Sequence, residues 1–276
     1  MSYTETGYVG LNNGYSSISG AMFNAVRQLP NTPIYNPLTP TGYNIFTQGT
    51  VSRVGQWDNF IPITSDLTNI AYVVNNNKYS SDLTRFIGSV SGDVKITDWL
   101  DYKLQVSKDR SVTTGFLYWN RVHGDGFSRG GFIDNNYLNL DRWNIQNILN
   151  FNKSFGSHNV NVVLVNEYQK QRSNSFFADG QGLSSDFFGD VGVISGSYAT
   201  QYSGGGTSEN GLISYAARLS YNYANKYFIQ GTIRRDGLSA LPTDNKWGNF
   251  PGLSLGWTVS NENFLNIYIR YFYFLF

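Results

Sequence analysis

Hydrophobic and polar residues alternate with a period of two over much of the chain, which is the pattern of β-strands with one apolar and one polar face. One alternating run spans residues 86–96, and after a short turn a second spans residues 100–107. The apolar positions of the two runs are Phe86, Gly88, Val90, Gly92, Val94, Ile96, Leu100, Tyr102, Leu104 and Val106. Polar residues occupy most positions between them, so the pair predicts a β-hairpin with two unlike faces.

The same alternation recurs further along the chain, at residues 142–152, 160–169, 213–223, 227–234 and 253–260. Only residues 21–29 suggest a short helix. The sequence therefore predicts an all-β protein built from consecutive antiparallel strands.

The predicted connections alternate in length. Those at 97–99, 153–159 and 224–226 are short, whereas the segments 108–141, 170–211 and 235–249 are long and rich in Gly, Asn, Asp, Ser and aromatic residues. Short turns at one end and long loops at the other, joining strands of about ten residues, are typical of a transmembrane β-barrel.

The apolar face carries aromatic residues near the predicted strand ends: Tyr102, Trp143, Tyr168, Tyr221, Tyr223, Tyr227 and Trp257. Rings with a polar tip favour the headgroup level of a membrane. We therefore expect an antiparallel up-and-down transmembrane β-barrel whose apolar face meets lipid and whose polar face lines water. The alternative is a soluble sheet in which the same rings pack across strands.

The composition narrows the class of protein. Of 276 residues, 41% are hydrophobic, 16% are aromatic and only 14% are charged, against about 25% charged in an ordinary soluble domain. No segment approaches the roughly 20 apolar residues of a spanning helix. The absence of cysteine excludes structural disulfides and thiol catalysis, and a net charge of +1 gives no electrostatic case for nucleic-acid binding.

The sequence offers little support for catalysis or metal binding. His123 and His158 are the only histidines, so a histidine-rich metal site is not expected. A Ser-His-Asp triad stays open, since its members need not be neighbours in sequence, but no G-x-S-x-G motif supports one. We therefore predict no enzyme, no catalytic residue, no metal and no cofactor.

Two groups of residues are candidates for contact with a solute. The long segment 108–141 holds Tyr118, Trp119, Phe127, His123 and Asp125; flat rings can stack on sugars, and polar neighbours can bond their hydroxyl groups. These rings could equally pack the loops against one another or against a partner protein. On the polar face, Arg218, Gln230 and Thr232 are candidates for lining a lumen.

The strongest motifs lie between residues 210 and 265. They are Ala217-Arg-Leu-Ser-Tyr-Asn-Tyr223, Asn225-Lys-Tyr227, Arg234-Arg-Asp-Gly237, Lys246-Trp-Gly-Asn-Phe-Pro251, Ser254-Leu-Gly-Trp257 and Glu262-Asn-Phe-Leu265. In this order and spacing they resemble the SusC/RagA class of TonB-linked outer-membrane transporters. Residues 21–37 look like a mid-barrel segment of the same class.

This resemblance implies a large plugged barrel in the outer membrane that imports glycans or peptides. It also implies a SusD-like surface lipoprotein and the TonB complex as partners of the full-length protein.

We expect residues 1–266 to be part of such a barrel, about ten strands of the 22 found in plugged transporters. Residues 267–276 are almost wholly apolar and are expected to be an aberrant tail, possibly frame-shifted. The chain as it stands shows no signal peptide, and alone we expect it neither to insert stably nor to transport. A soluble β-rich carbohydrate-binding module is the main alternative, and an outer-membrane enzyme or another barrel class is a third.

Overall fold

The computed structural model describes residues 2–9, 21–49, 51–55, 67–185, 196–262 and 264; the predicted tail at 267–276 lies outside them. The strands are β1 (Ser2–Val9), β2 (Ile45–Gln48), β3 (Val51–Val54), β4 (Lys78–Thr97), β5 (Leu100–Trp119), β6 (Phe132–Phe155), β7 (His158–Leu183), β8 (Tyr198–Tyr223), β9 (Tyr227–Leu238) and β10 (Trp247–Trp257). The helices are α1 (Ala21–Arg27) and α2 (Ile70–Asn76), with short 3₁₀ turns at Gly124–Gly126, Thr243–Asn245 and Val259–Asn261.

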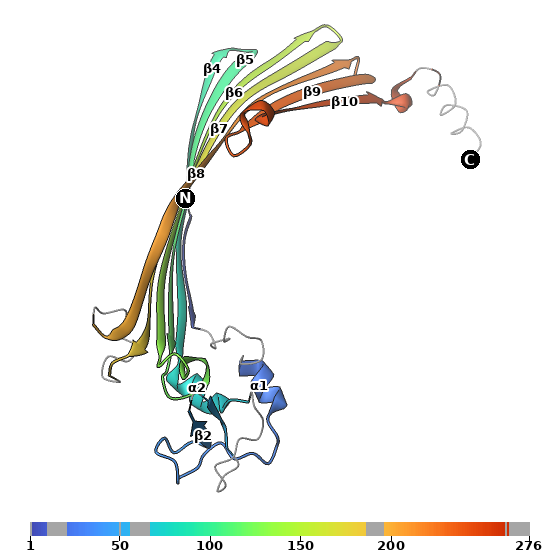
Figure 1. Ribbon diagram of the computed structural model, residues 1–276. Helices are drawn as coiled ribbons and strands as arrows, with labels where there is room; N and C mark the ends of the chain where they lie inside the picture. Colours follow the sequence, from blue (N-terminus) through green and yellow to red (C-terminus); the bar gives the residue numbers. More distant parts are fainter. Residues whose placement is uncertain are drawn as a thin grey trace, which may run out of the picture.

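Eight strands form one antiparallel sheet in the order β1-β4-β5-β6-β7-β8-β9-β10. From β4 onward each strand pairs with the next one in the chain, and the sheet bends into an open arc (Figure 1). This confirms the predicted all-β, up-and-down antiparallel class. β2 and β3 pair only with each other, so the sheet holds eight of the ten strands.

β9 and β10 have 12 and 11 residues, close to the ten expected, but β4 to β8, the strands before them, are much longer. β4 to β8 have 20 to 26 residues each, so most of the segments 108–141 and 170–211 is strand rather than loop. The hydrogen-bonded ladder between β5 and β6 continues to the pair Trp119 and Phe132. The sequence hid these extensions because apolar and polar residues do not alternate there, although backbone pairing continues.

The short turns lie at the predicted places. β4 and β5 are joined by Asp98 and Trp99, and β8 and β9 are joined by residues 224–226. The predicted turn at 153–159 contracts to Gly156 and Ser157 between β6 and β7. Gly156 has a φ of +59°, a left-handed conformation that glycine adopts without strain.

The strand register separates the residues into two faces. Val90 lies opposite Val106, Val106 opposite Ile145, and Ile145 opposite Tyr168, so the apolar positions share what we call the apolar face. Side chains on this face are widely exposed, with Leu253 at 75% and Leu255 at 72%. The alternating positions form the polar face.

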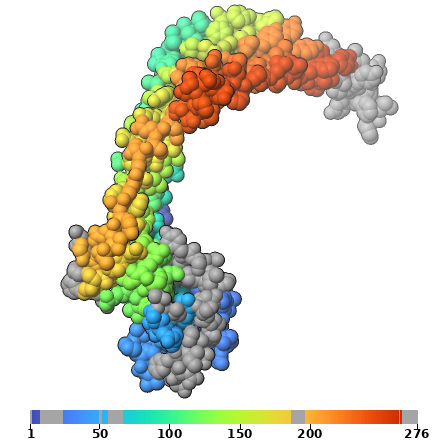
Figure 2. All heavy atoms as spheres, in the orientation of Figure 1, coloured from blue at the N-terminus to red at the C-terminus, as the bar shows by residue number. Residues whose placement is uncertain are grey.

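The other elements gather at the end of the sheet opposite the short turns. α1, α2 and the β2–β3 hairpin lie there beside the far ends of the long strands (Figure 1), and Figure 2 shows a broad mass at this end and a thin curved sheet beyond it. A small core of Tyr118, Ile133, Leu183 and Tyr198 packs between the strand ends. None of the helices within the described residues has the length and apolarity to cross a membrane.

Candidate functional site: a polar network across the sheet

The register places four polar side chains in one row across the polar face. Gln146 of β6 lies opposite Glu167 of β7, and Glu167 lies opposite Ser214 of β8, which in turn lies opposite Asp236 of β9. Because side chains alternate between faces, residues two positions along a strand return to the same face. The group made in this way, called here the Glu167 network, consists of Asn144, Gln146, Glu167, Gln169, Ser214, Arg234 and Asp236.

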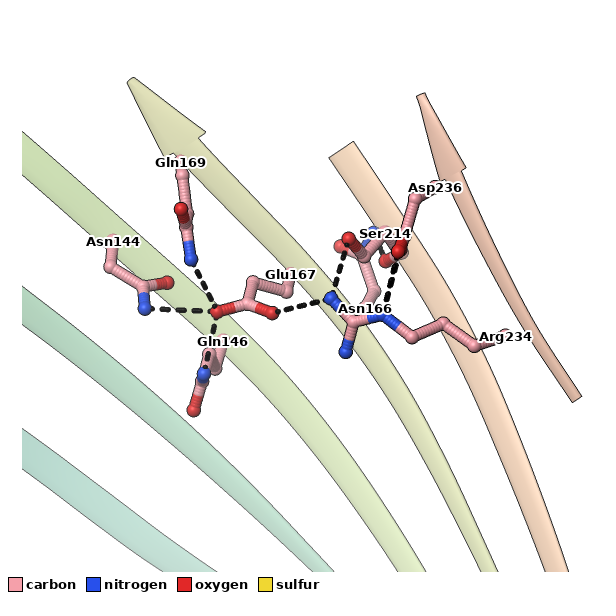
Figure 3. Close-up of polar contacts among 8 residues, drawn as sticks. All are labelled: Asn144, Gln146, Asn166, Glu167, Gln169, Ser214, Arg234 and Asp236. Carbon is pink, nitrogen blue, oxygen red and sulfur yellow. Dashed lines mark hydrogen bonds and ion pairs between the residues drawn. The ribbon is translucent and has the colours of Figure 1, made fainter. Parts of the chain in front are cut away.

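The carboxylate of Glu167 is the centre of this network. Its Oε1 accepts hydrogen bonds from the side-chain amides of Asn144 at 3.0 Å, Gln146 at 2.8 Å and Gln169 at 3.0 Å (Figure 3). Glu167 is only 7% exposed. A carboxylate buried to this extent requires such donors, since an unpaired charge away from water is strongly unfavourable.

Arg234 joins this centre to the neighbouring strands. Its Nη2 lies 3.4 Å from Oε2 of Glu167 and donates to Oγ of Ser214 at 3.0 Å. Its Nε donates to both carboxylate oxygens of Asp236, at 2.8 and 3.0 Å (Figure 3). The network therefore links four strands and holds two carboxylates against one guanidinium.

A second charged group lies on the polar face of β4 to β7. Asp109 accepts hydrogen bonds from Nε and Nη2 of Arg85, at 2.9 and 2.8 Å, and Nη1 of Arg142 lies 3.4 Å from its Oδ2. Arg142 also donates to Oε1 of Gln171 at 2.7 Å. This group carries two guanidinium ions for one carboxylate, so its charge is opposite to that of the Glu167 network.

Together these groups make the polar face a wall of fixed donors and acceptors. Such a surface can bind a polar solute through hydrogen bonds. The described residues contain no group of three or more metal-ligating side chains.

The predicted lumen residues lie on this face. Arg218 of β8 is directly opposite Thr232 of β9, and Gln230 is opposite Ser220, whose Oγ lies 3.3 Å from the Gln230 amide oxygen. Arg218, Gln230 and Thr232 are all exposed. Within the described part of the chain Arg218 makes no ion pair, so its guanidinium is open to solvent.

The predicted ligand contacts at the other end are more enclosed. Tyr118 is 8% exposed, and Trp119 is 2% exposed with its ring 5.0 Å from that of Phe132. Asp125 and Phe127 are partly exposed in the connection between β5 and β6. A solute approaching this connection would meet Asp125 and Phe127 before Tyr118 and Trp119.

His123 is fully buried and has a structural position. Its Nδ1 lies 2.6 Å from Oγ of Ser52, and its Nε2 accepts a hydrogen bond from the backbone N–H of Asn69 at 2.7 Å. Since Nε2 accepts, the ring is neutral with its proton on Nδ1. Burial lowers its pKa to about 3. His123 thus ties β3 and the first turn of α2 to the β5–β6 connection.

Sequence reasoning missed the residues at the centre of the polar face: Arg85, Asp109, Arg142 and Glu167. The available signal was weak, since Glu167 is the single acidic residue among the polar-face positions of its alternating run. Arg234 and Asp236 were noted as a motif.

No family model matches this chain. Among curated proteins, the sequence is 34% identical over 142 residues to a TonB-dependent receptor of Formosa agariphila, covering 51% of this chain and 14% of that protein. It is 27% identical over 270 residues to the TonB-dependent receptor SusC of Bacteroides thetaiotaomicron, covering 92% of this chain and 25% of SusC.

Solved structures agree on the fold. The sheet resembles a chain of the RagAB peptide transporter with a TM-score of 0.64 and 16% identity, covering 83% of this chain and 24% of that chain. The chain is related to the SusC/RagA-type TonB-dependent receptors. It spans a quarter or less of the length of these two curated relatives. They are receptors by name, and the structural neighbour is a transporter.

Proposed function

We propose that the full-length protein is a TonB-dependent transporter of the outer membrane and that this sheet is a section of its barrel wall. In this arrangement the apolar face lies against lipid and the polar face lines the lumen. The named relatives support the transporter class, and the two unlike faces support the orientation.

The observation that carries the proposal is the spacing of two aromatic rows on the apolar face. At the short-turn end the rings of Tyr223, Tyr227 and Trp257 stack in sequence, with centroids 6.4 Å apart in each pair. At the other end of β10, Tyr215 of β8 stacks on Trp247, also with centroids 6.4 Å apart. Trp247 and Trp257 bound the eleven-residue β10.

This spacing matches the thickness of a membrane. Ten steps of about 3.3 Å along a strand cover about 33 Å, and a strand tilt of about 40° reduces this to a height of about 25 Å. Outer-membrane barrels carry an apolar band about 25 Å tall between two aromatic girdles. A soluble sheet has no physical reason to place its aromatic rows at this separation.

The solute and the partners follow from the same assignment. We propose a glycan or a peptide as the solute, contacted in the lumen by Arg218, Gln230 and Thr232 and at the entrance by the β5–β6 connection, with Phe127 and Asp125 the most accessible candidates. A SusD-like surface lipoprotein and the TonB complex are proposed as partners, in keeping with the class of the relatives.

Spin labelling of the full-length protein in outer-membrane vesicles tests the orientation. We would place single nitroxide labels at Ala217, Arg218, Leu219 and Ser220 of β8, after substitution of each by cysteine. Collisions with oxygen, which dissolves in lipid, should be frequent at Ala217 and Leu219, whereas collisions with a water-soluble nickel complex should be frequent at Arg218 and Ser220.

The soluble carbohydrate-binding module predicts a different result. In such a module the apolar side chains of two sheets pack together, so labels at Ala217 and Leu219 would be protected from both reagents. That outcome, or the absence of any alternation, would refute the transporter wall.

A further inference from the structure

A cleft of about 510 Å³ opens on the apolar face beside Trp247, where β9 ends and β10 begins. It forms because β8 continues beyond Leu212, the last residue that it pairs with β9. The connection from β9 to β10 bends across this step, where the N–H of Ser239 donates to the carbonyl oxygen of Gly211 at 2.9 Å.

The wall of the cleft is apolar. Tyr168, Ile213 and Trp247 line it, and Tyr168 and Trp247 are 43% and 44% exposed. Gly211 and Gly237 also line it, and the ring of Trp247 packs over Gly237, 2.8 Å from where a Cβ would lie. The apolar surface continues from Ile213 along the same face of β8 through Tyr215 to Ala217, which lies opposite Ile233 of β9.

The rim of the cleft is positively charged. Lys170 and Lys246 line it together with Glu209. Lys170 lies 3.1 Å from Glu209, and Arg172 lies 3.4 Å from the same carboxylate, so one carboxylate serves two cations. Lys246 has no ion-pair partner among the residues that the structure describes. Two lysines and one carboxylate therefore line this rim, and the carboxylate is shared with Arg172.

We propose that this cleft binds the phosphate headgroup of a lipid, with the phosphate between Lys170 and Lys246 and the acyl chains along Ile213 and Ile233. The inference rests on the proposed function, because it requires the apolar face to lie against lipid. A soluble anion would bind the lysines but would leave the apolar wall uncovered. A lipid with a phosphate headgroup would bind the lysines through its phosphate and cover the apolar wall with its acyl chains.

The position in the membrane agrees with this ligand. Lys170 lies two residues beyond Tyr168 on the same face of β7, on the side away from the short turns. Lysine side chains at this level keep their charge at the headgroup layer while their stems lie on apolar surface. The guanidinium of Arg235 lies 4.8 Å from the ring centroid of Trp247 and adds a further cation next to the cleft.

Native mass spectrometry of the detergent-solubilised full-length protein tests the proposal. The probes are phosphatidic acid, the diacylglycerol with the same acyl chains, and inorganic phosphate. We expect phosphatidic acid to bind at least tenfold more tightly than diacylglycerol. The double variant Lys170→Gln/Lys246→Gln should weaken the binding of phosphatidic acid about thirty-fold, since each basic residue near an anionic lipid contributes roughly a factor of five to the affinity.

Lys153→Gln is the matched control. Its Nζ also lies over an aromatic ring of the apolar face, 5.1 Å from the centroid of Trp99, but at the opposite end of the sheet. This variant should bind phosphatidic acid within twofold of the unchanged protein.

Three results would overturn the lipid-phosphate site. The first is that phosphatidic acid and diacylglycerol bind equally tightly. The others are that Lys153→Gln weakens the binding of phosphatidic acid as much as the double variant does, or that equimolar inorganic phosphate displaces phosphatidic acid. In each case retention of diacylglycerol would leave the lipid-facing orientation intact. If neither lipid is retained and the protein is monomeric without detergent, the proposed function fails together with this inference.

Discussion

Substitution of Glu167 by glutamine tests whether the Glu167 network holds four strands together. The change keeps the size of the side chain but removes its charge. The new amide oxygen can accept at most two hydrogen bonds, whereas Oε1 of Glu167 now accepts three. At least one of the partly buried amides of Asn144, Gln146 and Gln169 would therefore lose its acceptor.

The expected loss of stability follows from these contacts. Hydrogen bonds to a charged group contribute about 1.5–3 kcal/mol each, against about 1 kcal/mol for neutral partners. The side chain of Arg234 is 42% exposed, so screening by water limits its ion pair with Glu167 to below about 1 kcal/mol. Loss of one such bond and weakening of the other two lead us to expect that Glu167→Gln lowers the free energy of unfolding by at least about 2.5 kcal/mol.

Urea unfolding of the full-length protein, followed by tryptophan fluorescence, measures this change. Asp93→Asn is the control, because Asp93 lies on the same face, has a side chain 64% exposed and lies 3.8 Å from Lys103. Asp93→Asn should change the free energy of unfolding by less than about 0.5 kcal/mol. If Glu167→Gln shifts the unfolding transition no more than Asp93→Asn does, the network has no structural role.

Two further predictions concern the end of the sheet opposite the short turns. The pKa of His123 is lowered to about 3 from about 6.5 in the unfolded chain. The buried neutral ring therefore contributes fully to the free energy of unfolding above pH 6.5, and this contribution is lost as the pH falls toward 3. Hydrogen exchange at the amide of Asn69 should show about 2 kcal/mol less protection at pH 5 than at pH 7, and a protection independent of pH would contradict this. Gly180→Ala would place a Cβ 2.8 Å from Cγ of Tyr198 and should destabilise the protein by about 1–3 kcal/mol in the urea assay. Gly206→Ala, where the added Cβ meets nothing within 4 Å, should have little effect, and equal shifts for both variants would refute the steric argument.

Several features of the fold could be predicted because they depend on neighbouring residues alone. Alternation of apolar and polar residues predicted the hairpin of β4 and β5 and the two faces of the sheet. The turn at 224–226 was evident from the break between two alternating runs. The extensions of β5 to Trp119 and of β7 to Leu183 were not predicted, because their side chains no longer differ between the faces.

The candidate site was predictable only in part. Arg218, Gln230 and Thr232 could be assigned to the polar face by counting positions along a strand. The enclosure of Trp119 could not be foreseen, since it depends on Phe132 and on the position of Arg129, whose guanidinium lies over its ring. His123 likewise gives no sign in the sequence that Ser52 and Asn69 would enclose it.

The sequence by itself determined that this chain forms strands with one apolar and one polar face, because that property repeats every two residues. Only the tertiary structure decided which side chains meet. Glu167 and Arg234 are 67 positions apart and come within 3.4 Å because β7, β8 and β9 pair in one particular register. A shift of that register by one residue would move every side chain of a strand to the other face, so the alternation excludes odd shifts, but it does not by itself distinguish registers that differ by two residues.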